Sequence, residues 1–246
     1  MGTTRLHPSE TRESRPDPKL TSAAKDQGSG ATSGSEHRTL ALFIGGAGDK
    51  KSYYLAGPYR NMAYALAAFD QRIEEAGLAG TCQSLYLGYH EVWSATAIGR
   101  LVAAEIHDKA TPIYIVGHSL GAWSGAHLSQ RLSEWGYRVE MLVTLDPVGS
   151  GLLVRLGSRI PYHRPAPHCH CWINVRAEPG RSNASDLVAQ LGRKWHVAGE
   201  PDIDEALDTN HANAWALFCN PLHDGRSAAD CMFESILEKT HLNEEK

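Results

Sequence analysis

The sequence contains no run of roughly 18 uncharged apolar residues, which is about the length that a membrane-spanning helix requires. Its first charged residues are not followed by an apolar segment either, so no secretory signal peptide is predicted. We therefore expect no membrane span, at most transient contact with a membrane surface, and a cytoplasmic location by default. Export would need a route that is independent of a signal peptide.

Cysteine is scarce and scattered. The 5 cysteines are odd in number and lack the spacing of a small secreted domain held together by disulfides. Two of them stand in His168-Cys169-His170-Cys171, which could suggest metal ligands. In a strand, however, the histidines and the cysteines would face opposite sides, and no second cluster completes a tetrahedral site. We expect no metal, and we interpret this segment as a strand that enters the core.

Positive charge is not in excess. The 24 Lys and Arg residues are outnumbered by 28 Asp and Glu residues, which gives a formal net charge of -4. A chain of this charge has no general basic field that would attract nucleic acid or anionic membranes. Nucleic acid is therefore not expected as a partner. The 42% hydrophobic content suits a packed core.

Large apolar residues are nearly missing from residues 1–38, which are rich in Ser, Thr, Gly, Pro and charge. Such a segment cannot bury enough surface to offset its chain entropy. We predict a disordered tail that serves as a linker or that docks a protein partner or directs export. A single catalytic domain is expected over residues 39–246.

From Thr39 onward, short apolar runs alternate with longer segments of helical period. Strands and helices in alternation predict an α/β fold with a mostly parallel sheet and helices on both faces. The expected strands are 40–44, 83–89, 113–116, 139–145 and 171–175, and the expected helices are 59–76, 94–106, 120–135 and 212–218. The chain beyond Asp186 is otherwise interpreted as helix and loop.

The segment Gly117-His118-Ser119-Leu120-Gly121 carries the chemistry. It fits G-x-S-x-G, the nucleophile elbow, in which a strand turns sharply into a helix and presents a serine above the sheet. Glycine is needed at both ends because a side chain would crowd the tight turn. An apolar strand before the motif and a helical pattern after it supply the required context. Ser119 is therefore the predicted nucleophile.

The same residues carry a family resemblance. His118-Ser119-Leu120-Gly121-Ala122 resembles the core of many lipases and related α/β-hydrolases, and Leu145-Asp146-Pro147-Val148 is similar to a segment of some lipases. The likeness covers about residues 40–218, and more loosely it extends to bacterial lipase effectors of type VI secretion. The resemblance implies an α/β-hydrolase fold and a bacterial serine esterase or lipase that acts in lipid degradation. It also implies that no cofactor is required.

A serine nucleophile needs a base, and in this fold the chain order is Ser, then acid, then His. His211 suits that order best, because it stands in a polar segment that leads into an apolar helix. His196 and His223 are the alternatives for this role.

Two residues compete for the acid that orients the histidine. Asp146 is favoured because Pro147 ends the strand directly after it, which leaves the carboxylate at the carboxyl edge of the sheet. Asp186 is the alternative acid: it follows the next strand, which is the commoner position in this fold. With Ser185 it could instead cap a helix that begins at Leu187.

Acyl transfer also requires donors for the developing oxyanion. The fold implies the backbone N–H of Leu120 as one donor, and the loop after an early strand as the other. The glycine-rich segment 45–48 has that position, with Gly46 or Ala47 as the donor. A phosphate-binding loop is not favoured, because the segment lacks both G-x-G-x-x-G and a G-K-[ST] ending.

Together these residues predict a serine hydrolase that cleaves a carboxylic ester, a lipid or phospholipid acyl ester, through an acyl-enzyme. A thioesterase or another acyl hydrolase is the alternative enzyme, and a catalytically silent binding scaffold is the alternative of a different class. Apolar side chains expected at the mouth, as an acyl pocket or lid, are Tyr53, Tyr54, Trp93, Leu152, Leu153 and Leu156.

Overall fold

A computed structural model describes residues 39–52, 57–197 and 201–244. The predicted tail, residues 1–38, lies outside this part of the chain. Six parallel strands form one sheet in the order β2-β1-β3-β4-β5-β6. Their bounds are β1 Thr39–Gly45, β2 Cys82–Gly88, β3 Ile113–His118, β4 Val139–Leu145, β5 Cys171–Ala177 and β6 Ile203–Leu207.

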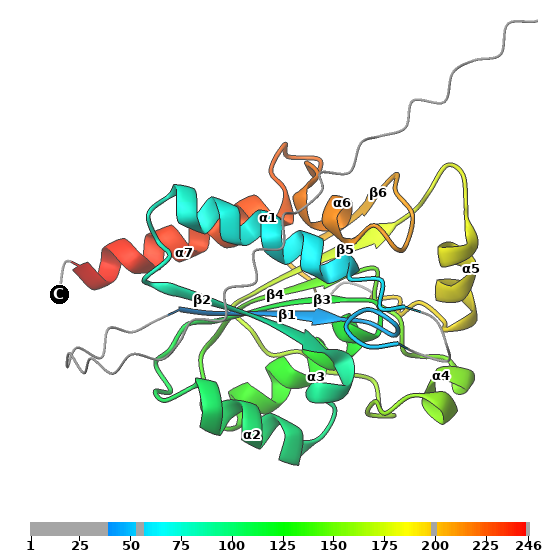
Figure 1. Cartoon of the computed structure of the whole chain (residues 1–246), viewed down its shortest axis with the longest axis horizontal. Helices are drawn as coiled ribbons and strands as arrows, with labels where there is room; N and C mark the ends of the chain where they lie inside the picture. The colour runs from blue at the N-terminus through cyan, green and yellow to red at the C-terminus, as the bar shows by residue number, and fades with distance from the viewer. Residues whose placement is uncertain (1–38, 53–56, 198–200, 245–246) are drawn as a thin grey trace, which may run out of the picture. The chain divides into compact units, whose positions relative to one another are not determined.

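Helices cover both faces of the sheet, as Figure 1 shows. One face packs on α1, α6 and α7, and the other on α2 and α3. Two short helices, α4 and α5, lie beyond the carboxyl ends of the strands. The helix bounds are α1 Asn61–Glu75, α2 Ala95–Glu105, α3 Leu120–Glu134, α4 Leu152–Gly157, α5 Ala184–Leu191, α6 Ala214–Cys219 and α7 Ala228–Glu244. The α/β class and the parallel sheet expected of an α/β-hydrolase fold are confirmed.

The central strands are apolar on both sides because both sides are covered. Every residue of β1 and β4 is buried, and alternate side chains of β1 enter the two different core clusters. Phe43 faces α1 and α6, where it meets Phe69 and Phe218, with ring centroids 5.5 Å and 5.6 Å away. The cover on both faces therefore explains why successive residues of these strands are apolar.

Three elements differ from the prediction. The interpretation of the chain beyond Asp186 as helix and loop was wrong for β6, whose charged sequence alternates between half-buried and exposed residues at the edge of the sheet. It also missed α7, in which charged residues interrupt the apolar stripe. The short α4 was not predicted either. In addition, β5 begins only at Cys171, so His168 and His170 precede the strand and are exposed.

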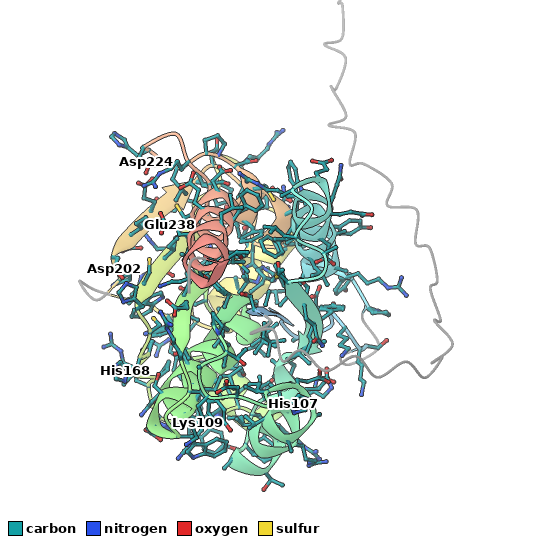
Figure 2. The ribbon with its side chains drawn as sticks, turned by 90° about the vertical axis from the view of Figure 1, so that its left-hand side faces the viewer. His107, Lys109, His168, Asp202, Asp224 and Glu238 are labelled. Carbon is teal, nitrogen blue, oxygen red and sulfur yellow. The ribbon has the colours of Figure 1, made fainter. Side chains whose placement is uncertain are left out.

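Figure 2 looks onto the amino ends of the strands. His107, His168 and Asp202, which precede β3, β5 and β6 in the chain, lie at this surface. None of the predicted site residues is among those labelled there; the residues that follow the strands meet at the opposite edge. Among the described residues, no helix is long and apolar enough to span a membrane.

Gly121 provides a stability test of the close approach between α3 and β1. A Cβ on Gly121 would fall on the Ile44 backbone, against its carbonyl oxygen and 2.7 Å from its carbonyl carbon. We expect Gly121→Val to lower the free energy of unfolding by about 3 kcal/mol and to abolish activity, because neither backbone can yield.

The matched control is Gly99→Val in α2, where an added Cβ would meet nothing within 4 Å. Its melting temperature should stay within about 2 °C of wild type, since glycine is the weaker helix former. Thermal unfolding of both variants checks the contrast, and equal melting temperatures for the two would show that the α3–β1 approach is not tight.

Candidate active site

The turn from β3 into α3 holds Ser119 in a conformation that L-residues rarely adopt, with φ 57 and ψ -123. Gly117, two residues before Ser119, permits this turn, because a Cβ on Gly117 would lie 2.5 Å from the Gly121 oxygen and 2.6 Å from the Ala122 Cα. Strain of this kind costs roughly 1–3 kcal/mol and persists only where the surroundings enforce it. This sharp strand-to-helix turn, with a half-buried serine at its apex, is the geometry expected of a nucleophile elbow.

The imidazole of His211 bridges Ser119 and Asp146. Its Nε2 lies 3.0 Å from the Ser119 Oγ, and its Nδ1 lies 2.6 Å from the Asp146 Oδ2. A carboxylate can only accept, so Nδ1 carries the proton that it donates to Asp146, and Nε2 is free to accept from the serine hydroxyl. His211 itself is buried and follows β6 in the chain. Three segments that are distant in sequence thus converge in one hydrogen-bonded chain.

Asp146 is fully buried and directly follows β4, with φ 42. Its backbone N–H donates to the Val175 oxygen at 2.7 Å, and its Oδ1 accepts from the Ala177 N–H at 3.1 Å. The same Oδ1 lies 2.9 Å from the Lys194 Nζ. Burial alone would raise the pKa of Asp146, but the bonds and charges of His211 and Lys194 outweigh it and lower that pKa. The carboxylate is therefore ionised and fixed in direction.

Asp186 contacts the backbone of His211 and not its ring. Its Oδ1 accepts from the His211 N–H at 2.8 Å, and its Oδ2 accepts from the Asn183 N–H at 2.8 Å and the Asn210 Nδ2 at 2.7 Å. Asn183 and Asp186 form the capping box at the start of α5, so the capping role considered for Asp186 is confirmed; the helix, however, begins at Ala184 and not at Leu187, and its N-cap is Asn183 and not Ser185. Asp186 thus ties α5 to the segment that carries His211.

His118 contacts the backbone carbonyl of His211, whereas Asp186 contacts its N–H. The His118 Nε2 lies 2.7 Å from the His211 carbonyl oxygen, and the two rings are 4.9 Å apart. Burial lowers the pKa of His118 to about 3, so the ring is neutral and Nε2 is the protonated nitrogen that donates. Both backbone groups of His211 are therefore bonded to side chains.

The glycine-rich loop after β1 passes directly over the serine. A Cβ on Gly46 would lie 2.8 Å from the Ser119 Cβ and 3.2 Å from its Oγ. Asp49 anchors the loop, since its carboxylate accepts from the N–H groups of Asn61 at 2.5 Å and Met62 at 3.2 Å at the start of α1. Sequence reasoning did not single out Asp49.

Besides the Gly46 loop, the sequence predicted a second oxyanion donor, the backbone N–H at the first position of α3. Leu120 occupies it, and an α-helix supplies no internal partner for an N–H at this position. Ala47, the alternative to Gly46, is half-buried in the same loop. The structure thus brings the Gly46 backbone close to Ser119, and Leu120 follows Ser119 directly at the start of α3.

The alternative bases are not brought to Ser119. His196 and His223 are exposed, and in the described part of the chain neither forms a hydrogen bond with the serine. Among the described residues, no group of three or more His, Cys, Asp or Glu side chains is arranged to hold a metal ion. Of the predicted mouth residues, Trp93 and Leu152 are exposed; Tyr53 and Tyr54 and the side chains of Leu153 and Leu156 lie outside the described part.

No protein-family model matches this sequence, and no curated protein matches it. A similar solved structure is described as YbtT, the type II thioesterase from the yersiniabactin NRPS/PKS biosynthetic pathway. It is 15% identical, the match covers 82% of this chain and 92% of that chain, and the TM-score is 0.38. A likeness of this degree carries no argument about chemistry, so the function has to be inferred from the site.

Proposed function

We propose that this chain is a serine hydrolase that cleaves a carboxylic ester, and that its substrate is a lipid or phospholipid acyl ester. Ser119 is the nucleophile, His211 the base and Asp146 the acid. Leu120 and Gly46, or Ala47 in place of Gly46, donate to the oxyanion. No cofactor takes part in these steps.

The observation that carries this proposal is the continuous hydrogen-bonded chain from the Ser119 Oγ through both nitrogens of His211 to Asp146. A serine hydroxyl becomes a useful nucleophile when a base removes its proton, and the base needs a carboxylate on its far nitrogen to hold the tautomer and stabilise the imidazolium. The hydroxyl, the imidazole and the carboxylate that this mechanism requires belong to residues that are buried or half-buried. The strained φ of both Ser119 and Asp146 supports a functional reason for their placement.

The reaction follows from these contacts. His211 Nε2 takes the hydroxyl proton as the Ser119 Oγ attacks the acyl carbonyl, and the oxyanion forms between the Leu120 N–H and the loop at Gly46. His211 then gives the proton to the leaving alcohol, which departs and leaves an ester of Ser119. Water, activated by the same nitrogen, hydrolyses this acyl-enzyme and restores the serine.

Exposed apolar side chains beside the site support an acyl lipid as the substrate. Leu187, Val188 and Leu191 of α5 are 57%, 65% and 61% exposed, and Leu152 at the start of α4 is 69% exposed. The two helices meet where the Gly151 N–H donates to the Gly192 oxygen at 3.1 Å. Because α5 is bonded to the His211 segment, these exposed side chains belong to an element that adjoins the site.

A cavity at the glycine-rich loop after β1, lined in part by charged and polar side chains, suits the opposite end of such a substrate. Its volume is about 190 Å³, and Gly46, Gly48, Lys51 and His90 are among the residues that line it. A polar leaving group placed here would leave the acyl chain on the apolar side.

A fluorophosphonate probe tests the proposal. We expect the wild-type protein to react in proportion to its amount, with the adduct on Ser119, because the probe requires a serine activated by a base. A panel of short esters, long-chain esters, phospholipids and thioesters then ranks the substrates by kcat/KM, and long-chain esters or phospholipids should lead. Thioesters in the lead would leave the mechanism intact and change the substrate class.

Two controls keep the result interpretable. Ser133→Ala removes a serine hydroxyl from the far end of α3 and should label like wild type, whereas Ser119→Ala should not label. Folded wild-type protein that resists the probe would contradict the proposal and favour the binding scaffold.

A further inference from the structure

Lys194 contacts Asp146 through the carboxylate oxygen that His211 does not use. Its Nζ lies 2.9 Å from the Asp146 Oδ1 and donates to the Ala177 oxygen at 2.8 Å. Asp146 therefore lies between two groups, with the imidazole of His211 on Oδ2 and the ammonium of Lys194 on Oδ1. The Lys194 side chain is 24% exposed, so solvent screens this ammonium much less than it would screen a surface charge.

The chain segment around Lys194 is built onto the end of β4. Lys194 pairs with Val148 in an antiparallel bridge, and the Trp195 N–H donates to the Pro147 oxygen at 2.8 Å. Gly149 donates in turn to the Arg193 oxygen at 3.3 Å. This bonding follows Asp146 directly in the chain, so it holds the backbone of Lys194 close to that of Asp146.

We propose that Lys194 is a positioning residue of this site, which holds Asp146 through Oδ1 and whose positive charge lets His211 remain unprotonated, and thus a competent base, at lower pH. The inference rests on the proposed function. Its physical basis is that a fixed cation near an imidazole disfavours the imidazolium, while the carboxylate between them favours it.

Two other ionisable groups near His211, His118 and Asp186, do not add positive charge to the site. His118, whose ring is 4.9 Å from that of His211, is neutral because burial lowers its pKa to about 3. Asp186 contacts the His211 backbone, and its own carboxylate has a lowered pKa: burial raises it, but bonds from Asn183, His211 and Asn210 outweigh the burial. Lys194 is therefore a cation that counters both Asp146 and Asp186.

The sign of the expected change follows from these charges. Loss of the Lys194 charge makes the imidazolium more favourable, so His211 holds its proton to higher pH. The acid limb of the kcat/KM profile for an ester should then shift upward by on the order of 0.5 to 1 pH unit in Lys194→Met. Lys194→Gln, which keeps a donor but not the charge, should shift in the same way, and Lys194→Arg should keep the wild-type midpoint.

The matched control is Arg193→Met, which removes the same charge one residue away from an exposed side chain. Its midpoint should stay at the wild-type value. A purely structural role of Lys194 would lower the rate or the melting temperature without moving the midpoint. Folded Lys194→Met and Lys194→Gln proteins that both keep the wild-type midpoint would overturn the inference.

A second readout does not depend on turnover. The His211 Cε1 proton, assigned by comparison with His211→Asn, can be titrated by NMR in wild type, Lys194→Met and Arg193→Met. A midpoint raised only in Lys194→Met supports the inference, and equal midpoints contradict it. Because this titration needs no substrate, it separates the role of Lys194 from the proposed function, whose own failure would appear as wild-type protein that neither labels nor hydrolyses esters.

Discussion

Replacing Ser119 by alanine is expected to lower kcat/KM for ester hydrolysis by on the order of 10⁵, to the level that the remaining oxyanion donors and substrate binding provide. The reason is that His211 then has no hydroxyl to deprotonate, although its ring and Asp146 stay in place. The fold should persist, because the Ser119 Oγ is bonded to His211 at the mouth of the site and does not support the core. Kinetics with a chromogenic ester and thermal unfolding measure both effects.

Ser133→Ala is again the matched control, since its hydroxyl bonds the His168 oxygen, and His168 lies at the amino-end surface of the sheet (Figure 2). It should retain wild-type turnover. Hydrolysis by Ser119→Ala at the wild-type rate would remove the basis for a serine mechanism.

The second large effect is expected for Asp146→Asn, with a loss in kcat on the order of 10⁴. Two donors, the Ala177 N–H and the Lys194 Nζ, meet the Asp146 Oδ1. An asparagine would turn its carbonyl oxygen toward them and present its NH₂ group to the His211 Nδ1. The imidazole would then be held with its proton on Nε2, where it cannot accept the proton of Ser119.

Asp186→Asn is the contrasting variant. Its carboxylate accepts three bonds from backbone and amide groups, and none from the His211 ring. An amide retains one acceptor oxygen, so the variant should lose about 1 kcal/mol of stability and only a small part of its activity, as the segment that carries His211 loosens. Turnover and unfolding midpoints of both variants decide the matter, and a severe catalytic loss confined to Asp186→Asn would make Asp186 the acid.

The sequence alone was sufficient for the elements in which short-range pattern and burial agree. The apolar runs at β1, β3 and β4 and the glycines around Ser119 are local features, because an elbow of this kind needs a strand, two small residues and a helix in direct succession. The same local reasoning predicted the helix 94–106, which α2 confirms: Ser94 is its cap, and the Ser94 Oγ accepts from the Ala97 N–H at 3.2 Å. The chain order of the fold left three histidines, and the polar segment that leads into an apolar helix favoured His211 over His196 and His223.

The tertiary structure decided what depends on contacts between distant segments. Asp146 and Asp186 both follow strands, and only the packing of β4 beside β5 directs one carboxylate to the imidazole and the other to the backbone of His211. The contacts of Lys194 with Asp146 and of His118 with His211 span 48 and 93 residues, so no short-range pattern could reveal them. An edge strand such as β6 is equally hard to predict, because it is identified by the neighbour with which it pairs and not by its own apolar residues.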